Sequence, residues 1–266
     1  MRRLGFIGTG NMGGALIRAA SKDPENELIL ANRHPEKAQT LLTELNTAGC
    51  VTDNAGAASE ADYLFLGVKP QMFAEMTESI RAALAGRSRR VILVTMAAGI
   101  SLTKLAQLLG ADYPAIRIMP NTPASIGEGM ILYTCTADVT AEEEAEFLQA
   151  MRHAGRFSRL TENQIDAGSA VSGCGPAFVD LFIEALADGG VACGLPRRQA
   201  LEFAAQMVAG SARLVLESGK HPAELKDAVC SPGGTTIQGV RKLEENGFRG
   251  TVMDAVIAAY EKNFHL

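Results

Sequence analysis

The sequence Gly8-Thr9-Gly10-Asn11-Met12-Gly13 follows directly on the apolar run Leu4 to Ile7 and precedes the helix-compatible run Gly14 to Ala20. By itself a G-x-G-x-x-G motif is a weak indication, because glycine-rich turns also occur without a ligand. In this chain a strand precedes the motif and a helix follows it, which is the context that a dinucleotide-binding turn requires. The glycines permit a tight turn and a close approach to a pyrophosphate at the positive end of the helix. The motif therefore predicts a dinucleotide-binding turn between a strand and a helix.

Outward from this turn, residues 1–160 alternate apolar runs of strand length with stretches of helical periodicity. Nearly continuous apolar strands that alternate with helices are typical of a parallel sheet covered on both faces, as in α/β proteins. A capping box at Thr140 to Glu143 predicts one further helix start. The predicted strands are Leu4–Gly8, Leu28–Ala31, Tyr63–Val68, Val91–Thr95, Ala115–Met119, Met130–Tyr133 and Arg156–Leu160, and the predicted helices between them include Glu36–Leu45 and Gln71–Leu84.

Beyond residue 160 the strand pattern stops, and only helices are predicted. Prolines such as Pro222 stand at first helical positions and glycines such as Gly219 stand where helices end. The pattern predicts an α/β domain over residues 1–160 and an all-helical domain over residues 161–266. The helix from Pro196 is apolar around much of its circumference, which favours a subunit interface. The predicted helices are Glu162–Ser172, Pro176–Cys193, Pro196–Glu217, Pro222–Cys230, Thr235–Glu245 and Thr251–Phe264.

Composition and charge narrow the class of protein. The chain has 266 residues, 47% of them hydrophobic, and 25 Lys and Arg against 30 Asp and Glu, which gives a net charge of −5. This balance provides no electrostatic reason to expect nucleic acid or an anionic membrane as a partner. No stretch approaches the ~18 apolar residues of a membrane span, and the run after Arg3 is too short for a secretory signal. We therefore expect a cytoplasmic protein.

The five cysteines are odd in number and widely spaced, at Cys50, Cys135, Cys174, Cys193 and Cys230. The absence of any C-x-x-C pair argues against a structural zinc site, and the odd number argues against a disulfide framework. We expect mostly buried, reduced thiols and no metal.

The end of the second predicted strand bears on the choice between NAD and NADP. About 20 residues beyond the last glycine of the turn, an NAD enzyme usually has an Asp or Glu that holds the ribose 2′-hydroxyl. This chain has Ala31-Asn32-Arg33-His34 at that point. The acid that would repel a 2′-phosphate is absent, and Arg33 offers a bidentate cation for it. NADPH is the expected cofactor and NADH a weaker one, although a solvated loop charge is the alternative interpretation of Arg33.

Three loops follow predicted strands at the edge where an open parallel sheet binds ligands. They are Gly67-Val68-Lys69-Pro70, Thr95 to Gly99, and Met119-Pro120-Asn121-Thr122-Pro123. Ligands lie beyond the carboxyl ends of such strands, so we expect these loops to face the ribose and the nicotinamide. Lys69 could act through its amine, but a lysine beside Pro70 at a strand end is at least as well explained by backbone contacts.

Two segments of the helical half are unusual in composition. Ser231-Pro232-Gly233-Gly234-Thr235-Thr236 places Gly-Gly at the start of a predicted helix, with free backbone N–H groups and two hydroxyls that suit a small carboxylate. Ser172 to Ala177 places Cys174 between glycines, as in a nucleophile elbow, but it follows a helical pattern instead of a strand. Tight helix packing and capping remain an alternative explanation of both segments.

Together these motifs resemble those of the pyrroline-5-carboxylate reductases, the last enzymes of proline synthesis. The resemblance runs through almost the whole chain, and its most specific part is Leu225-Lys226-Asp227 followed by Ser231 to Thr236. It implies a Rossmann-type NADP-binding domain and a helical domain that binds substrate and interleaves with a second subunit, in dimers that commonly assemble into decamers. The active site would lie between one subunit's cofactor domain and the helices of the pair. The other matching stretches are Phe6–Met12, Gly67–Pro70, Ala97–Gly99, Met119–Pro123, Ser172–Ala177, Ala187–Gly190 and Gly194–Arg197.

The resemblance also implies roles for individual residues. Two departures from the family pattern leave side-chain contacts open: Cys174 replaces the commoner Ser, and Ala228 with Cys230 stands where relatives often carry polar residues. The implied substrate-binding residues are Ser231, Gly233, Gly234, Thr235 and Thr236, with the Thr236 hydroxyl near the ring nitrogen as the catalytic group. The implied cofactor-binding residues are Gly8, Thr9, Gly10, Asn11 and Met12 at the pyrophosphate, Asn32 and Arg33 at the 2′-phosphate, Asn54 at the adenosine, and Val68, Lys69, Pro70, Met96, Ala97 and Ala98 at the nicotinamide ribose.

The implied reaction is reduction of the C=N bond of L-1-pyrroline-5-carboxylate to L-proline by hydride transfer from NADPH. An iminium carbon is already electrophilic, so no metal is needed. Two other interpretations stay open. A β-hydroxyacid-type dehydrogenase has a similar pair of domains but usually carries a helix lysine as acid and base, where this chain has Gly-Gly-Thr-Thr. An NADP-sensing binding module would use the same fold without turnover.

Overall fold

The computed structural model describes residues 1–263, which form two compact units. The first unit holds Met1 to Cys174 and the end of the last helix from Tyr260 onward, and the second unit holds Gly175 to Ala259. The helix that follows residue 160, α7 (Glu162–Ser172), packs on strand β7 (Gly129–Cys135) and therefore belongs to the first unit. Residues 264–266, which end the predicted 161–266 domain and include Phe264 of a predicted helix, lie outside the described residues.

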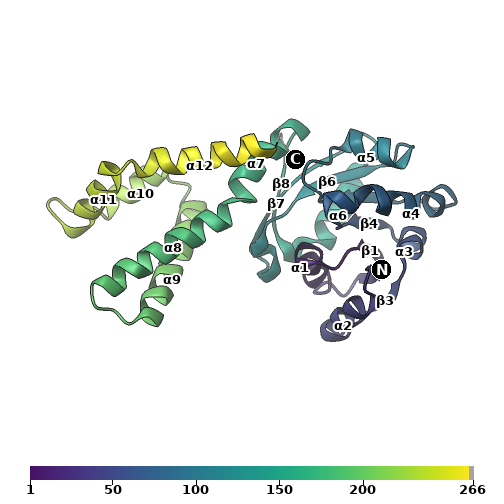
Figure 1. The fold of residues 1–266 in the computed structure, drawn as a ribbon, viewed down its shortest axis with the longest axis horizontal. Helices are drawn as coiled ribbons and strands as arrows, with labels where there is room; N and C mark the ends of the chain where they lie inside the picture. Colours follow the sequence, from purple (N-terminus) through teal and green to yellow (C-terminus); the bar gives the residue numbers. More distant parts are fainter. Residues whose placement is uncertain (264–266) are drawn as a thin grey trace. The chain divides into compact units, whose positions relative to one another are not determined.

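An eight-stranded sheet forms the centre of the first unit, in the order β3-β2-β1-β4-β5-β6-β7-β8 (Figure 1). The predicted parallel sheet is confirmed from β3 to β6, whereas β7 pairs antiparallel with β6, and β8 pairs parallel with β7. The last two strands therefore run opposite to the other six. The strands not yet bounded are β1 (Arg2–Ile7), β2 (Asn26–Ala31), β3 (Gly49–Thr52), β4 (Tyr63–Leu66), β5 (Ile92–Thr95), β6 (Ala115–Met119) and β8 (Gly155–Arg159).

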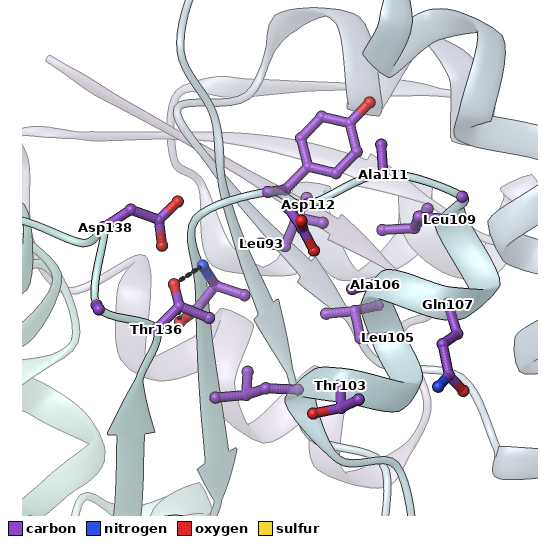
Figure 2. Close-up of a pocket in the computed structure, with 15 residues that line it drawn as sticks. Leu93, Thr103, Leu105, Ala106, Gln107, Leu109, Ala111, Asp112, Thr136 and Asp138 are labelled. Carbon is purple, nitrogen blue, oxygen red and sulfur yellow. Dashed lines mark hydrogen bonds between the residues drawn. The ribbon is translucent and has the colours of Figure 1, made fainter.

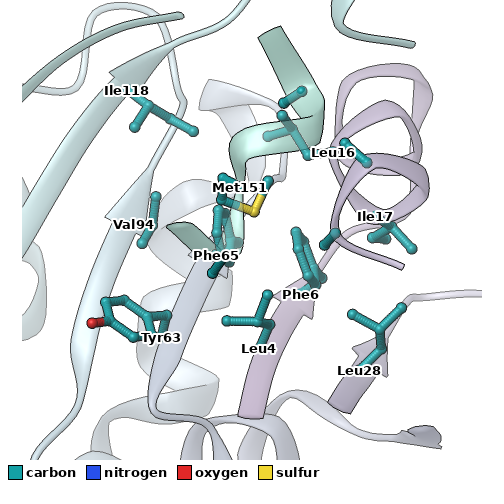
Figure 3. Packing of buried hydrophobic residues seen from close by; sticks show 14 of the residues in the cluster. Leu4, Phe6, Leu16, Ile17, Leu28, Tyr63, Phe65, Val94, Ile118 and Met151 are labelled. Carbon is teal, nitrogen blue, oxygen red and sulfur yellow. The ribbon is translucent and has the colours of Figure 1, made fainter. Parts of the chain in front are cut away.

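Two apolar cores cover the two faces of this sheet. On one face, Phe6 and Phe65 stack with their ring centroids 4.3 Å apart, next to Leu16 and Ile17 of α1 (Figure 3). Alternate strand residues such as Leu64 enter the opposite core. Helices α1 (Asn11–Ala20), α2 (Pro35–Leu45) and α6 (Ala141–Ala150) supply the first core, and α3 (Asn54–Glu60), α4 (Phe73–Ala85) and α5 (Leu102–Leu109) supply the second. Short 3-10 helices lie at η1 (Pro70–Met72), η2 (Thr122–Ile126) and η3 (Arg152–Ala154).

One strand and two α-helices of the first unit were not predicted: β3, α3 and α5. Strand β3 is a four-residue edge strand and its first two residues are exposed, so it lacks a continuous apolar run. Helix α3 is held at its N-terminus by Asp53, whose Oδ1 accepts a 2.7 Å hydrogen bond from the N–H of Gly56. The predicted capping box at Thr140 is confirmed, because Thr140 and Glu143 each accept from the other's backbone N–H.

The second unit is helical throughout, as predicted. Helix α11 (Thr235–Glu245) has the predicted bounds, whereas α9 (Arg197–Ser218) begins one residue later, with Pro196 as its N-cap. Helix α12 (Phe248–Asn263) begins three residues earlier than the predicted Thr251. The remaining helices are α8 (Gly175–Ala192) and α10 (Pro222–Ala228).

One helical stretch, Glu162–Ala192, is long and apolar enough to cross a membrane by length and composition. This stretch corrects the expectation that no segment of the chain approaches a membrane span. A single such helix is weak evidence for a membrane span, because an apolar helix of a soluble protein can have the same length and composition.

All five cysteines are free thiols, as predicted, but their expected burial is wrong. Cys50 and Cys193 are exposed, and Cys135, Cys174 and Cys230 are half-buried. The reason is local: Cys50 lies on the edge strand β3 and Cys193 directly follows the last turn of α8.

Candidate active site

The glycine-rich turn joins β1 to α1 at the carboxyl edge of the sheet. Gly8 has a φ of +102°, and a Cβ atom built on it would lie 2.6 Å from the carbonyl oxygen of Gly67, in the loop after β4. A Cβ atom on Gly13 would lie 2.3 Å from the carbonyl oxygen of Gly8. A Cβ atom on Gly10 would meet no atom within 4 Å. Two glycines thus make the turn possible, and the third leaves open space beside it.

The N-terminus of α1 has the properties of an anion site. Gly10 is the N-cap and forms no side-chain cap, and the first turn carries no acid. The first N–H groups of the helix are therefore left for an external acceptor, and the helix dipole favours negative charge there. Together with the open space at Gly10, this arrangement fits a dinucleotide pyrophosphate.

A cavity of about 680 Å³ lies beside this turn and brings together seven of the predicted cofactor-binding residues. Those seven are Gly8, Gly10, Asn32, Arg33, Asn54, Val68 and Lys69. Thr9 and Asn11 line a second cavity of about 600 Å³ between α1 and α2, which Gly10 also borders. Met12, Pro70, Met96, Ala97 and Ala98 line neither of these two cavities.

The end of β2 carries the residues predicted to bind the 2′-phosphate. Asn32 is half-buried, and its Nδ2 donates a 3.0 Å hydrogen bond to the carbonyl oxygen of His34, which shapes the loop. Arg33 is exposed, and no hydrogen bond or ion pair engages its guanidinium within residues 1–263. The cation at this edge is therefore available to a ligand.

The same cavity includes residues that sequence reasoning missed, on α4 and at the start of α3. Asn54 donates from Nδ2 to Oγ of Ser79 at 3.0 Å, so the two helices are joined at the cavity wall. Asp53 and Glu75 add two acids to a rim that also holds Lys69. Asp53 could have been found as a helix N-cap, but Glu75 and Ser79 come from a different helix and only the tertiary fold places them here.

The loops after β4 and β5 lie next to each other, as their parallel pairing requires. A Cβ atom on Gly67 would lie 3.6 Å from the sulfur of Met96, so the two loops are in contact. Lys69 and Pro70 are exposed, whereas Ala97 is buried at 4% exposure. The predicted nicotinamide loops therefore meet at one edge, where Ala97 is buried and Lys69 is exposed.

The predicted substrate segment lies in the second unit, between α10 and α11. Gly234 is the N-cap of α11 without a side-chain cap, and the first turn, which begins with Thr235 and Thr236, contains no acid. The N–H of Gly234 donates 3.0 Å to the carbonyl oxygen of Ser231, which closes the turn before the helix. Ser231, Thr235 and Thr236 are exposed. The segment thus presents two hydroxyls and uncapped N–H groups, a suitable receptor for a carboxylate.

Other candidate features carry no site. Cys174 follows a helix, and its N–H donates to the carbonyl oxygen of Ser169 at 3.1 Å, so the strand before a nucleophile elbow is absent. A cavity of about 740 Å³ lies beneath α5, near the amino ends of β5 and β6, and Figure 2 shows Leu105, Thr136 and Asp138 around it. None of the predicted site residues lines that cavity. No cluster of three or more His, Cys, Asp or Glu suited to a metal is found in residues 1–263.

Comparison with known proteins decides the family. Pyrroline-5-carboxylate reductase of Escherichia coli strain K12 is 42% identical over 267 residues, which cover 98% of this chain and 97% of the relative. The chain belongs to the pyrroline-5-carboxylate reductase family. The family model for pyrroline-5-carboxylate reductase dimerisation matches residues 162–266, and a model described as NADP oxidoreductase, coenzyme F420-dependent, matches residues 3–99. The α/β half and the helical half are thus each matched separately.

Solved structures of pyrroline-5-carboxylate reductases have the same fold as this chain. The crystal structure of the Plasmodium falciparum pyrroline carboxylate reductase with NADP bound is 32% identical, has a TM-score of 0.86, and covers 98% of this chain and 97% of that one. The 1-pyrroline-5-carboxylate reductase of Streptococcus pyogenes is 34% identical, with a TM-score of 0.87 and coverage of 99% and 98%. Membership of the pyrroline-5-carboxylate reductase family makes this chain an NAD(P)-dependent oxidoreductase.

Proposed function

We propose that this chain reduces the C=N bond of L-1-pyrroline-5-carboxylate with NADPH and releases L-proline, the last step of proline biosynthesis. The observation that carries the proposal is the 42% identity with the Escherichia coli reductase over 98% of the chain, which includes both units. Similarity confined to the cofactor domain would support an oxidoreductase but would not identify its substrate.

NADPH is the proposed cofactor, with NADH as a weaker alternative. The uncapped N-terminus of α1 and the open face of Gly10 would hold the pyrophosphate. Asn32 and the unengaged Arg33 would bind the 2′-phosphate, and Asn54 the adenosine. The nicotinamide ribose would lie against the loops after β4 and β5, which contain Val68, Lys69, Pro70, Met96, Ala97 and Ala98. The NADP in the Plasmodium falciparum relative supports this choice.

The substrate carboxylate is proposed to bind at the start of α11. Ser231, Gly233, Gly234 and Thr235 would hold it through hydroxyl and backbone N–H groups, and this contact would fix the orientation of the ring. The Thr236 hydroxyl would donate to the ring nitrogen or orient a water molecule there. When bound, NADPH supplies the hydride that the imine carbon accepts. The chain's own contribution is mainly the placement of the two reactants.

A homodimer with interleaved helical domains is proposed as the working form, with decamers as a further assembly. The described residues of the second unit expose many large apolar side chains, such as Leu181 at 71%, Leu216 at 64% and Met253 at 63%. An apolar surface of this extent favours a protein–protein interface, and the matched family model is one of dimerisation. Light scattering of the purified protein tests this part. We further propose that the enzyme acts in the cytoplasm.

The proposed activity is tested by following NADPH oxidation with racemic pyrroline-5-carboxylate. NADH with the same imine and NADP with a β-hydroxyacid serve as parallel assays. We expect turnover of the imine with NADPH, slower turnover with NADH, and none of the β-hydroxyacid. Tight NADPH binding without turnover of the imine would refute the reductase and favour a sensor, and oxidation of the β-hydroxyacid would favour a dehydrogenase.

A further inference from the structure

Asn121, in the loop after β6, is buried with both ends of its side-chain amide engaged. Its exposure is 7%, its Nδ2 donates 2.9 Å to the carbonyl oxygen of Ser172, and its Oδ1 accepts 2.9 Å from the N–H of Met130. A backbone carbonyl can only accept and a backbone N–H can only donate, so these partners fix the orientation of the amide. The position therefore requires one donor and one acceptor on the same short side chain.

The two partners lie on elements that Asn121 joins. Met130 belongs to β7, and Ser172 is the last residue of α7, just before the chain enters the second unit at Gly175. Helix α7 is closely packed on β7, since a Cβ atom on Gly168 would lie 2.4 Å from Cδ1 of Leu132 and Ile165 is fully buried. Asn121 thus secures the C-terminal end of a helix whose middle is already held by packing.

Asn121 also lies at the edge of the sheet that carries the proposed nicotinamide loops. Strand β6 pairs in parallel with β5, with Arg117 opposite Thr95, so the loop after β6 lies beside the loop that holds Met96 and Ala97. One side chain therefore links this edge to the segment through which the chain leaves for the unit that carries Thr236. Asn121 does not line the 680 Å³ cofactor cavity.

We propose that Asn121 is a positioning residue for the reduction. Its two hydrogen bonds fix the end of α7, the point at which the chain leaves the first unit, relative to the nicotinamide edge. This inference rests on the proposed function. Hydride transfer depends steeply on alignment, and a misplacement of about 1 Å can slow a reaction on the order of 100-fold. Asn121 acts on turnover and leaves NADPH binding unchanged.

The test uses Asn121→Asp in the full-length enzyme. The ionised carboxylate can still accept a hydrogen bond from the N–H of Met130. It has no hydrogen to donate to the carbonyl oxygen of Ser172, so two oxygen acceptors face each other there. We expect kcat to fall about tenfold or more while the dissociation constant of NADPH changes by less than about twofold. We also expect a larger primary isotope effect on kcat with NADPH deuterated at the transferred position, because hydride transfer becomes more rate-limiting.

A pH profile separates this role from a general structural one. A protonated Asp has the same donor and acceptor as Asn, so the kcat of Asn121→Asp relative to the unsubstituted enzyme should recover as the pH falls. The ionisable side chains on the segments that contact Asn121 are Glu162 and Asp166 near the other end of α7, Tyr133 and Cys135 further along β7, and Glu128 and Cys174 in the adjoining turns. These side chains are the same in both proteins, so the ratio compares two enzymes that differ only at position 121.

Asn163→Asp is the matched control, since it makes the same change on an exposed residue of α7 and its Oδ1 still accepts from the Thr161 hydroxyl. Asn121→Ala, which is uncharged and removes both hydrogen bonds, repeats the kcat and NADPH measurements if Asn121→Asp does not fold. An unchanged kcat, an equal loss of kcat and NADPH affinity, or a kcat ratio independent of pH overturns the proposal. Inactivity of the unsubstituted enzyme and of Asn163→Asp on the imine refutes the proposed function instead.

Discussion

The guanidinium of Arg117 on β6 donates to the carboxylate of Asp166 on α7 at 2.8 Å, with only 3% of the arginine side chain exposed. Glu162 lies 3.5 Å from the same guanidinium and accepts from the N–H of Leu102 at 2.7 Å. The carbonyl oxygen of Asp166 also accepts from Asn263, at the end of α12. Ion pairs with Arg117 thus hold the first half of α7 against the sheet, and the hydrogen bond from Asn121 holds its last residue, Ser172.

Because the Arg117–Asp166 ion pair is buried on the arginine side, we expect the loss of Asp166 to destabilise the protein more than the loss of Arg117. Asp166→Ala leaves the buried Arg117 with one weaker partner, whereas Arg117→Met removes the buried charge and leaves two acids that are each about one-third exposed. We expect Asp166→Ala to lower the free energy of unfolding by about 3 kcal/mol and Arg117→Met by about 1 kcal/mol. Urea denaturation measures both, and Arg241→Met at an exposed pair should stay within about 0.5 kcal/mol. The reverse order would contradict the argument.

The lowered pKa of Asp23 should make the stability of the fold depend on pH. Burial opposes its ionisation, but the N–H of Glu25 and the guanidinium groups of Arg2 and Arg152 outweigh burial, and the pKa of Asp23 is lowered. A lowered pKa stabilises the fold above the unfolded value of about 3.9, and this contribution is lost as the pH falls through the folded pKa.

Asp23→Asn should therefore destabilise the protein by about 2–4 kcal/mol at neutral pH, and the difference from the unsubstituted protein should shrink below about pH 4. Denaturation curves at several pH values measure this difference. Asp112→Asn, at an exposed position, is the control and should change stability by less than about 0.5 kcal/mol. A difference that stays constant down to acid pH would show that the Asp23 charge is not the cause.

Two glycines of the turn should respond differently to alanine. Gly8→Ala meets both a φ of +102° and the carbonyl oxygen of Gly67, so it should lower the melting temperature and NADPH affinity together. Gly10→Ala meets no protein atom and should weaken NADPH binding about tenfold with an unchanged melting temperature. Thermal unfolding and NADPH titration by fluorescence measure the two effects. Equal NADPH affinity in Gly10→Ala and the unsubstituted protein would place the pyrophosphate elsewhere.

Arg33 should set the preference between cofactors. Arg33→Ala removes a charge-assisted contact, generally about 1.5–3 kcal/mol, and should weaken NADPH binding by about tenfold or more while NADH binding stays the same. The ratio of kcat/KM for NADPH and NADH measures this change. Arg81→Ala, on the exposed face of α4, should leave the ratio unaltered. A fall in kcat/KM for both NADPH and NADH would mean that Arg33 supports the fold instead of binding the 2′-phosphate.

Thr236 should matter for turnover more than for cofactor binding. Thr236→Ala removes the hydroxyl proposed near the ring nitrogen but leaves the helix start, whose N-cap is Gly234. We expect kcat to fall about 100-fold with NADPH affinity within about twofold. Thr251→Ala, which removes an exposed hydroxyl at the start of α12, provides the comparison. Comparable losses of turnover and NADPH affinity in Thr236→Ala would remove its assigned role.

Short sequence patterns predicted most of the fold, because turns and helix starts are determined by residues that are neighbours in the chain. The turn at Gly8 to Gly13 and the helix start at Thr235 are each specified by neighbouring residues, and the structure places both as expected. The direction of β7 was missed, although the connection Pro120 to Glu128 is shorter than the dozen or more residues of a parallel crossover. An apolar run shows that a strand exists but carries no information about its direction.

The candidate site was predictable only where one segment forms it. Arg33 was predicted from its place after a strand and Asn54 from the family resemblance, and both line the cavity, but Ser79 and Glu75 reach the same cavity through the packing of α4 beside α3. Likewise Asn121 stood out as part of a loop at the cofactor edge, whereas its bond to Ser172, 51 residues away, follows only from the packing of α7 on β7. Contacts between distant segments require the tertiary structure.

The most direct test of the reductase is to quantify L-proline and NADP formed by the purified protein from pyrroline-5-carboxylate and NADPH. We predict that L-proline accumulates in equal amount to the NADPH consumed and that Thr236→Ala slows both together. NADPH consumption without L-proline, or NADPH binding with neither product, would contradict the account.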